Sequence, residues 1–443
     1  MGFYICSNCG YGSASWIGKC PDCNQWNSLV LQRDEKDKRK EKTQKLTFKP
    51  LTEVPSLVKG RLQTGLFEFD RVLGGGFVSG EIVLLTGEPG VGKSTLILQS
   101  LSNLKTLYIS GEEAAEQVKD RAERLNIQLG NFFFSDTLQV EGIIEGAREI
   151  REKIDVIVID SVQTVYSKEV EGQPGSITQL KETAAKLIRF AKENKIPIIV
   201  IGHVTKDGDI AGPKTLEHMV DAVINFEGER VSHFRVLRAQ KNRFGSTDEI
   251  GIFEMAGRGL REVNDPLAFL EDTTGHVPGK AIVGSMEGRR PLFFEIQVLA
   301  SPSILTMPRR VVKGVDYSKV LLLLAVIRKH LNLPLHSYDI YVNVVGGVEI
   351  KSPAADLGIV ASLISSIKNL PLPPKSIFVG EVGLLGEVRQ VYGEKKIVSE
   401  AKRLALPQVF SSETVKSLKE LQKQLGEKGK KAIATPKGIV FSE

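Results

Sequence analysis

Cysteine is nearly absent from this chain: all four cysteines lie among the first 23 residues, and none follows Cys23. A disulfide framework belongs to secreted proteins, and nothing in the sequence suggests export. Long hydrophobic runs are missing as well, since the longest, residues 320–327, is far below the roughly 20 apolar residues that span a bilayer. The start of the chain is polar and lacks the basic segment of a signal peptide. We therefore expect a cytoplasmic protein without membrane contact.

Neither sign of charge dominates, because 59 lysines and arginines face 53 aspartates and glutamates, for a net charge of +6. This surplus is only a mild indication of a polyanionic partner. The hydrophobic share of 42% and the charged share of 25% are those of an ordinary soluble protein. At 443 residues the chain exceeds what one core usually serves, so we expect two or three domains.

The cysteines form two Cys-x-x-Cys pairs, Cys6 with Cys9 and Cys20 with Cys23, separated by ten residues. Such pairs can present four thiolates tetrahedrally to one Zn²⁺. Two disulfides are the competing use, but they fit a secreted chain better than this one. A four-sulfur site leaves no open position for a substrate. We therefore predict a zinc module whose task is docking or recognition.

Changes of pattern divide the chain into four parts. A lysine- and glutamate-rich linker (31–50) follows the zinc module (1–30). Short apolar runs that alternate with amphipathic stretches then predict an α/β domain with a mainly parallel sheet (51–270), and a third segment (271–443) has helices and a strand of its own. The predicted strands are 81–86, 106–110, 132–134, 156–160, 198–202, 222–227, 234–240 and 339–344. The predicted helices are 93–101, 114–125, 140–152, 177–194, 317–330 and 354–366.

The apolar run 82–85 leads directly into a glycine-rich segment with the spacing of a phosphate-binding loop. Its glycines allow backbone N–H groups to wrap around phosphates. Lys93 would reach the β- and γ-phosphates, and the Ser94 hydroxyl would hold Mg²⁺. The segment predicts binding of ATP or GTP by Gly87, Glu88, Pro89, Gly90, Val91, Gly92, Lys93, Ser94 and Thr95.

Acidic residues follow two of the other predicted strands. Asp160 ends the strand 156–160, where a carboxylate can hold Mg²⁺ through bound water, the Walker B role. Glu112 and Glu113 follow the strand 106–110. We expect Glu112 to orient the water that attacks the nucleotide, and Glu113 to cap the next helix.

Polar residues at two later strand ends complete the predicted site. His203 follows the strand 198–202, where it would sense the γ-phosphate or merely cap the strand. Lys241 and Arg243 lie one residue apart in an extended segment and therefore emerge on one face. Inserted into a neighbouring subunit's nucleotide site, this pair would neutralise charge that develops on the γ-phosphate. An ordinary basic turn is the alternative.

These motifs together resemble the bacterial RadA (Sms) DNA-repair family, over essentially the whole chain. The resemblance rests on the cysteine pairs, Thr64-Gly65, the run from Asp70 through Gly74-Gly75-Gly76, the phosphate loop and Lys241-Asn242-Arg243-Phe244-Gly245. It implies a RecA-like P-loop ATPase core assembled as a ring, expected to be a hexamer, that binds single-stranded DNA and drives branch migration of recombination intermediates. It also implies that Lys241 and Arg243 act on ATP held by the adjacent subunit. A RecA recombinase, and a replication or repair protein that meets the zinc module, are candidate partners.

The last segment resembles the Lon protease fold but departs from it at the nucleophile. Lon-type proteases use a serine nucleophile and a lysine base; Ala354 stands at the serine position, and Lys395 matches the lysine. A lysine without its serine cannot form an acyl-enzyme, and Ser352 is two residues out of register. We expect a Lon-protease-like α/β domain that serves ring assembly and DNA contact without proteolysis.

Two segments, 161–176 and 205–216, resemble the DNA-binding loops of RecA-like proteins. The basic residues that we consider as phosphate contacts are Lys168, Lys206, Lys214, Arg309, Arg310 and Lys313. Two other functions compete with the DNA-dependent motor: an ATP-dependent Lon-like protease, and a clock-type regulatory ATPase ring whose hydrolysis is indifferent to DNA.

Overall fold

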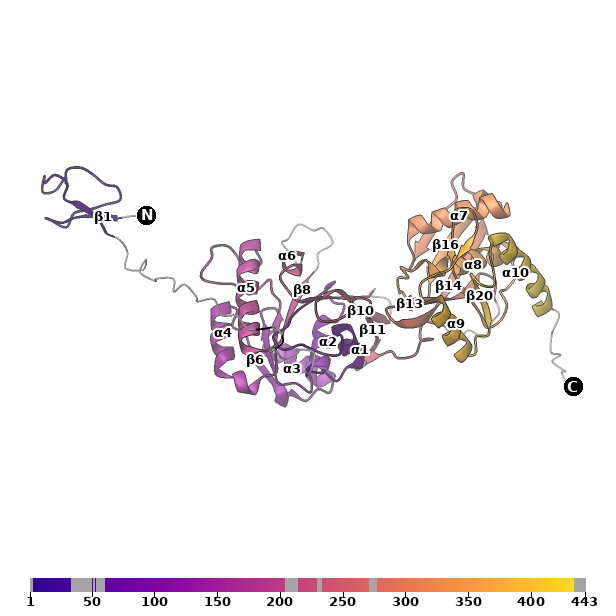
Figure 1. The fold of residues 1–443 in the computed structure, drawn as a ribbon, viewed down its shortest axis with the longest axis horizontal. Coiled ribbons are helices and arrows are strands. Elements are labelled where there is room, and N and C mark those ends of the chain that lie inside the picture. Colours follow the sequence, from indigo (N-terminus) through magenta and orange to yellow (C-terminus); the bar gives the residue numbers. More distant parts are fainter. Residues whose placement is uncertain are drawn as a thin grey trace. The chain divides into compact units, whose positions relative to one another are not determined.

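The computed structural model describes residues 3–32, 50, 52, 60–203, 214–228, 233–270 and 277–433. The chain separates into two compact units, Met1–Ser56 and Leu57–Glu443 (Figure 1). In the first unit, β1 (Phe3–Cys6) lies between β2 (Gly12–Ser13) and β3 (Leu29–Gln32) in an antiparallel sheet. This sheet is too small to bury much apolar surface, so the module needs another source of stability.

The second unit begins with a nine-stranded sheet of order β12-β11-β10-β9-β4-β8-β7-β5-β6. The strands from β9 to β6 in this order run parallel, and β10, β11 and β12 extend the sheet in antiparallel fashion. Their bounds are β4 Ile82–Gly87, β5 Thr106–Ser110, β6 Phe132–Ser135, β7 Val156–Asp160, β8 Ile198–His203, β9 Ala222–Glu227, β10 Phe234–Asn242, β11 Ile250–Ala256 and β12 Gly259–Glu262. The strands predicted in this domain are confirmed, and β11 and β12 were missed.

Helices cover both faces of this sheet (Figure 1). The helices are α1 Phe67–Leu73, α2 Lys93–Ser100, α3 Ala115–Arg124, α4 Val140–Glu149, α5 Ile177–Asn194 and α6 Lys214–Glu217. Strand β4 is buried on both sides: Val83 and Leu85 belong to one hydrophobic core, and Ile82 and Leu84 belong to the other. This alternation explains why the central strand reads as an uninterrupted apolar run.

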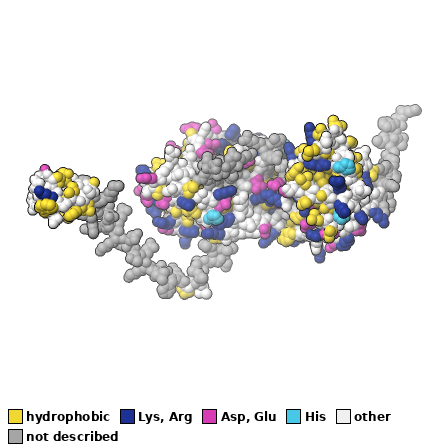
Figure 2. All heavy atoms as spheres, turned by 90° about the horizontal axis from the view of Figure 1, so that it is seen from above, with side chains coloured by type: hydrophobic (Ala, Val, Ile, Leu, Met, Phe, Trp, Pro, Cys, Tyr) yellow, Lys and Arg dark blue, Asp and Glu magenta, His cyan; other side chains and the backbone are white. Residues whose placement is uncertain are grey.

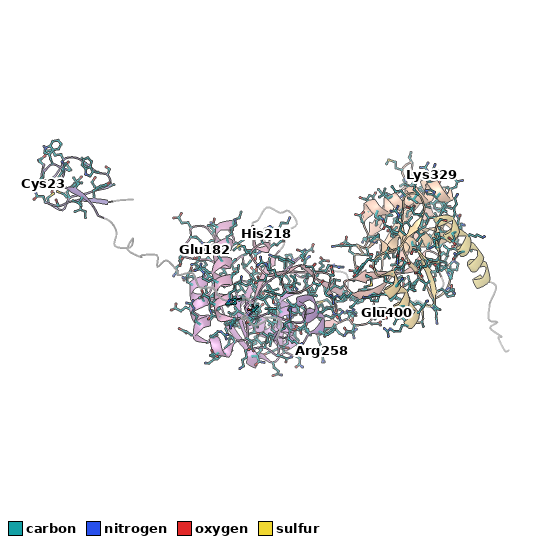
Figure 3. All side chains as sticks on the ribbon, in the orientation of Figure 1. Cys23, Glu182, His218, Arg258, Lys329 and Glu400 are labelled. Carbon is teal, nitrogen blue, oxygen red and sulfur yellow. The ribbon has the colours of Figure 1, made fainter. Side chains whose placement is uncertain are left out.

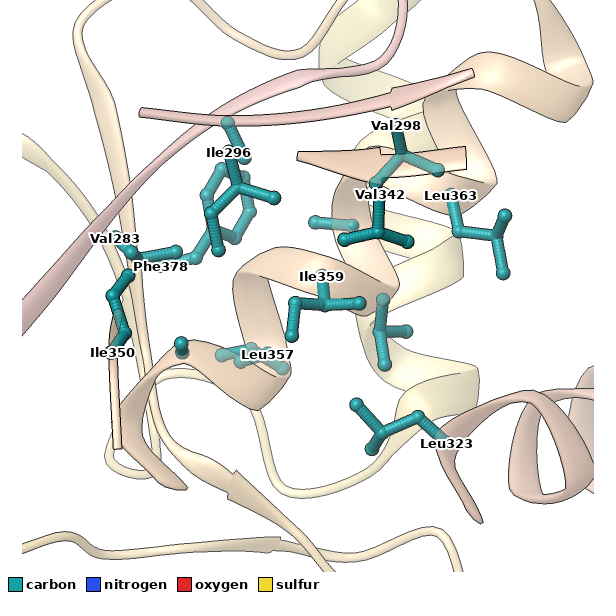
Figure 4. Close-up of a cluster of buried hydrophobic side chains, with 14 of the residues drawn as sticks. Val283, Ile296, Val298, Leu323, Val342, Ile350, Leu357, Ile359, Leu363 and Phe378 are labelled. Atoms are coloured by element: carbon teal, nitrogen blue, oxygen red, sulfur yellow. The ribbon is translucent and has the colours of Figure 1, made fainter. Parts of the chain in front are cut away.

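A six-stranded sheet of order β15-β16-β14-β13-β17-β20 forms the centre of the C-terminal part. The bounds are β13 Lys280–Glu287, β14 Arg290–Pro302, β15 Arg310–Lys313, β16 Tyr338–Val344, β17 Ser376–Val379, β18 Glu381–Val382, β19 Val388–Arg389, β20 Gln408–Ser411, α7 Tyr317–Leu331, α8 Asp356–Lys368, α9 Glu394–Arg403 and α10 Leu418–Ile433. Helix α8 packs on the sheet, with Leu357 and Ile359 in the core (Figure 4). Gly358 is required there, because a Cβ would lie 2.0 Å from Val283 Cγ1.

The α/β fold class is therefore confirmed for the two large sheets of the larger unit. An ion pair links the elements around these two sheets, in which Arg290 of β14 donates to the buried Glu68 carboxylate of α1 at 2.9 Å. Glu68 also accepts from the backbone N–H of Ile252 in β11. Burial raises the pKa of Glu68, which these donors counteract. The predicted boundary near residue 270 stays a prediction.

Candidate functional site

The predicted phosphate loop runs from the end of β4 to the start of α2. Gly92, the residue before α2, has φ of 110°, in the left-handed region that favours glycine. A Cβ on Gly87 would lie 2.4 Å from the Phe226 carbonyl oxygen of β9. The loop path therefore depends on glycine at both ends. The first N–H groups of α2 have no partner within the helix, so this loop suits an anion such as a triphosphate.

Lys93 is held inside this loop. Its side chain is 5% exposed, and Nζ donates to the carbonyl oxygens of Gly87 at 2.9 Å and Glu88 at 3.1 Å. Burial lowers the pKa of Lys93, while the carboxylates of Asp160 and Glu112 raise it. A buried ammonium held by the loop's own carbonyl groups is placed to meet phosphate oxygens with little reorganisation.

Asp160, the last residue of β7, connects this strand to β5 and to the start of α2. Its Oδ2 accepts from the Ser94 hydroxyl at 3.1 Å and from the Tyr108 hydroxyl at 2.6 Å. Asp160 is 3% exposed, and burial raises its pKa whereas these two donors lower it. The structure thus brings together the serine and the aspartate that were predicted to hold Mg²⁺. An oxygen-rich pair of this kind is what Mg²⁺ prefers.

Tyr108 was not predicted as part of this site. It is buried in β5, which pairs with β7 so that Ser110 lies opposite Asp160. A buried tyrosine needs a hydrogen-bond partner for its hydroxyl. A tyrosine within a predicted apolar strand was therefore the one signal in the sequence that pointed to this contact. The partner itself follows from strand order, which a single sequence does not display.

The two glutamates after β5 have separate environments. The Glu113 carboxylate forms two hydrogen bonds with Arg121 of α3, at 2.5 and 2.6 Å. The prediction that Glu113 caps α3 is wrong, because Ala114 is the N-cap residue and Arg121 takes the carboxylate. Glu112 is exposed, and its charge acts on both Lys93 and Asp160. Its role in orienting water stays a prediction.

Lys241 and Arg243 contact the same turn of their own chain. Lys241 Nζ donates to the carbonyl oxygens of Glu217 at 2.7 Å and Val220 at 2.8 Å, in the turn that contains His218 (Figure 3). Arg243 is 51% exposed and pairs with Asp221 at 3.3 Å. Burial lowers the pKa of Lys241, and the nearby Arg243 charge adds to this.

The position of this turn separates the two cations from the phosphate loop of the same chain. Asp221 accepts from the backbone N–H of Ile82, the first residue of β4, at 3.2 Å. The phosphate loop follows Gly87, the last residue of β4. At about 3.3 Å per residue, the two ends of this strand lie about 17 Å apart. The pair therefore lies at the opposite end of the strand from its own phosphate loop.

Arg235 is a second residue that the sequence reasoning missed. It lies near the start of β10, is 5% exposed, and donates from Nε to the Val91 carbonyl oxygen of the phosphate loop at 3.2 Å. A Cβ on Gly228 would lie 2.4 Å from Arg235 Cδ, so glycine makes room for this side chain. Burial lowers the pKa of Arg235. An arginine among the apolar residues Phe234, Val236 and Leu237 at the start of the strand was the available signal.

The four cysteines lie together in the first unit. Their Sγ atoms are all within 4.8 Å of one another, with Cys6 to Cys23 at 3.6 Å and Cys9 to Cys20 at 3.5 Å (Figure 3). Four sulfurs around one Zn²⁺ lie about 3.8 Å apart, given zinc–sulfur bonds of about 2.3 Å. The residues therefore fit a structural zinc ion, which when bound supplies folding free energy to this small module.

The nucleophile position of the expected Lon-like domain holds an alanine. Ala354 is 1% exposed and has no group that can attack a carbonyl. The Ser352 hydroxyl accepts from the Ala354 N–H at 3.2 Å and so caps a short helical turn. Lys395 is exposed at the second position of α9.

The residues predicted to contact DNA differ in exposure and in their contacts within the chain. The loop 161–176 is fixed by Gln179, whose amide bonds to Ser167 and Val170, and Lys168 on this loop is exposed. Lys206 and most of the segment 205–216 lie outside the described residues, as does the His203 side chain, and Lys214 is exposed. The Arg310 guanidinium binds the carbonyl oxygens of Tyr338 and Leu335, while Arg309 and Lys313 are exposed. None of these contacts with DNA is tested.

Two protein families match parts of this chain, one in the first unit and one mainly in the second. Residues 47–209 match the AAA domain family, and residues 4–30 match the rubredoxin metal binding domain family. DNA repair protein RadA of Bacillus subtilis (strain 168) is 45% identical over 423 residues, which cover 92% of this chain and 91% of the relative. DNA repair protein RadA of Streptococcus pyogenes serotype M1 is 43% identical, covering 92% of each chain.

Among solved structures, the RadB recombinase is 25% identical and covers 46% of this chain and all of its own, with a TM-score of 0.37. Within the described residues, none of the helices has the length and apolarity that crossing a membrane requires. The ATPase core and the four-cysteine module predicted from the sequence are confirmed, and a Lon-protease-like C-terminal domain is consistent with the RadA relatives.

Proposed function

The chain belongs to the family of bacterial RadA DNA repair proteins, and on that premise we propose that it is a DNA-dependent ATPase that works as a ring on recombination intermediates. It is a DNA-repair ATPase by family. The finer proposal is that it binds single-stranded DNA, assembles as a hexamer and promotes branch migration and strand exchange. Such work on DNA would place it in the cytoplasm.

In this proposal each chain holds ATP in its own phosphate loop. Lys93 compensates the charge of the β- and γ-phosphates, and Ser94 and Asp160 would hold Mg²⁺, which when bound neutralises phosphate charge during phosphoryl transfer. Tyr108 keeps the Asp160 carboxylate in place through its 2.6 Å hydrogen bond. Glu112, whose charge acts on both Lys93 and Asp160, orients the attacking water.

A neighbouring chain completes the site with Lys241 and Arg243. The observation that carries this step is their location at the end of β4 opposite to the phosphate loop, anchored to the turn at Asp221. Cations that the length of β4, about 17 Å, separates from their own loop would have to act on another chain's nucleotide. Half of the Arg243 side chain is exposed and so remains available to a partner.

The experiment is ATP hydrolysis by the full chain with and without single-stranded DNA, at two salt concentrations. We expect DNA to raise the rate of hydrolysis, and the stimulation to weaken at high salt because phosphate contacts release counterions. Hydrolysis that DNA does not change at either salt concentration would contradict the motor and favour the clock-type ring. If DNA does stimulate hydrolysis, binding assays would test the two proposed protein partners. These are a RecA recombinase, and a replication or repair protein that binds the zinc module.

A Lon-like protease is not favoured, since Ala354 supplies no nucleophile. Cleavage of casein by the purified protein, lost on Lys395→Ala, would revive it. We place the C-terminal domain in ring assembly and DNA contact, where its exposed Arg309 and Lys313 are candidate phosphate contacts.

A further inference from the structure

The zinc module exposes both tryptophans of the chain. Trp16 is 56% exposed and Trp26 is 70% exposed, and these are the two tryptophans among 443 residues. Hydrophobic side chains are visible together on the surface of this unit (Figure 2). Large aromatic side chains dominate the energetics of cores and interfaces, so two that lie in water need an explanation.

The backbone places the two rings beside one glycine. The segments around Gly18 and Trp26 pair with each other, because Asn27 N–H donates to the Gly18 carbonyl oxygen at 2.8 Å and Lys19 lies opposite Trp26. A Cβ built on Gly18 would lie 3.6 Å from the Trp16 ring and 4.0 Å from the Trp26 ring. Both rings therefore flank a residue without a side chain, and each tryptophan keeps more than half of its surface exposed.

The charge around these rings is small and locally positive. Lys19 Nζ lies 5.7 Å from the centre of the Trp26 ring. Asp22 is the one carboxylate between residues 3 and 32. A zinc ion held by four thiolates has a net charge of about −2, so the module as a whole does not attract phosphate. A ligand that uses both rings must be recognised mainly through flat, unsaturated groups.

We propose that Trp16 and Trp26 form a stacking platform for unpaired bases of single-stranded DNA, with Lys19 beside it. Every base has a π-face, and stacking on aromatic side chains is tolerant of sequence. Duplex DNA offers no such faces, because its bases are stacked on each other, so the platform selects unpaired strands. This inference rests on the proposed function, since it adds a contact for the same polynucleotide outside the ATPase core.

Intrinsic tryptophan fluorescence tests the platform directly, because both tryptophans of the zinc-loaded full chain lie in it. We expect titration with an oligo(dT) strand to quench this fluorescence, because a stacked base alters the surroundings of the indole ring. The duplex of the same length, and an abasic strand with the same phosphates, should leave it unchanged. Equal quenching by the abasic strand would overturn the proposal, because phosphate contact would then suffice.

Substitutions separate the platform from the motor. Trp16→Ala with Trp26→Ala should weaken binding of a fluorescein-labelled oligo(dT) strand at least about tenfold, as loss of stacked bases does. Trp16→Phe with Trp26→Phe should retain most of the affinity, and zinc content should be unchanged in both variants. Basal ATP hydrolysis should also be unchanged, since neither residue lies in the ATPase unit.

The outcomes distinguish this inference from the function on which it rests. If single-stranded DNA stimulates hydrolysis but leaves the tryptophan fluorescence unchanged, the platform is wrong and the motor stands. The exposed rings would then have to be assigned to a protein partner. If DNA neither stimulates hydrolysis nor quenches the fluorescence, the proposed function and the platform both fail.

Discussion

The two larger domains each place a lysine at the start of a helix and bury an aspartate, with different consequences. In the ATPase domain, Lys93 is 5% exposed, and its charge interacts with Asp160, which in turn holds Ser94. In the C-terminal domain, Lys395 is exposed, and Asp356 instead pairs with Lys319 at 2.9 Å. Residue types alone therefore do not make a site. The side chains must converge on one place.

The comparison also separates folding from chemistry. Ala354 and Asp356 are as deeply buried as Asp160, so the C-terminal core is intact although its nucleophile position holds a methyl group. The fold of this domain is maintained by packing of α8 on the sheet (Figure 4), which needs no reactive group. Substitutions in the two domains should therefore act on different measurable quantities.

The largest effect is expected at Lys93. Lys93→Ala should lower ATP hydrolysis to background, because the phosphates lose the one side-chain cation that the loop itself buries. The matched control is Lys395→Ala in the other domain, which should hydrolyse ATP at the normal rate. The measurement is steady-state release of phosphate. Normal hydrolysis by Lys93→Ala would contradict the prediction that this loop binds the nucleotide phosphates.

Arg243 tests whether the site is shared between chains. Arg243→Ala should lower kcat by about 10³-fold with ATP binding retained, as removal of an arginine finger does. Mixing this variant with Lys93→Ala should restore part of the turnover. At an interface between the two variants, the intact phosphate loop of one chain can meet the intact Arg243 of the other. A collapse of ATP affinity in Arg243→Ala instead, with no recovery on mixing, would place Arg243 in the site of its own chain.

These two predictions use residues that the sequence identified. They could be identified because each belongs to a motif that is contiguous in the sequence. The phosphate loop is a contiguous strand–loop–helix pattern, and Lys241 and Arg243 are recognised by their spacing, so both can be found without knowledge of the sheet. Tyr108 and Arg235 could not be placed in the same way. Their partners, Asp160 and Val91, depend on β5 lying beside β7 and on β10 reaching the phosphate loop.

The rest of the fold shows the same contrast: elements marked by a local pattern were predicted, and those that depend on contacts between distant segments were not. The apolar runs from β4 to β10 predicted their strands, with boundaries close to those observed. Strands β11 and β12 extend the sheet by antiparallel pairing, and their burial comes from contact with α1 and the C-terminal core. Glu113 was misassigned because its partner Arg121 lies two helical turns away, where a capping rule does not look.

A smaller effect is expected at Arg235, which supports the loop without any proposed contact with nucleotide. Arg235→Gln should raise KM for ATP about tenfold and change kcat little, because the Val91 carbonyl loses its donor and the loop is less well positioned. Arg235→Lys should recover part of the affinity, since an ammonium can still donate. An unchanged KM in Arg235→Gln, in a variant that melts at the normal temperature, would show that the loop holds its shape alone.

The smallest effect is expected at Asp356, the buried aspartate of the domain without chemistry. Burial raises the pKa of Asp356 from 3.8 to about 6, although Lys319 and the Val382 N–H oppose this. The folded chain therefore retains a proton that the unfolded chain has released between these two values. The stability that this proton contributes is complete below pH 3.8 and is lost as pH rises to about 6.

Asp356→Asn should remove this slope and leave ATP hydrolysis unchanged, because asparagine can still accept from the Val382 N–H. A shift of about two pKa units corresponds to at most about 3 kcal/mol at 1.36 kcal/mol per unit, before solvent screening of Lys319, which is 33% exposed, is considered. Urea denaturation at pH 4 and pH 7 would measure it. A loss of hydrolysis in Asp356→Asn would break the contrast between the two domains, because it would give this aspartate a share in the chemistry that Asp160 is proposed to serve.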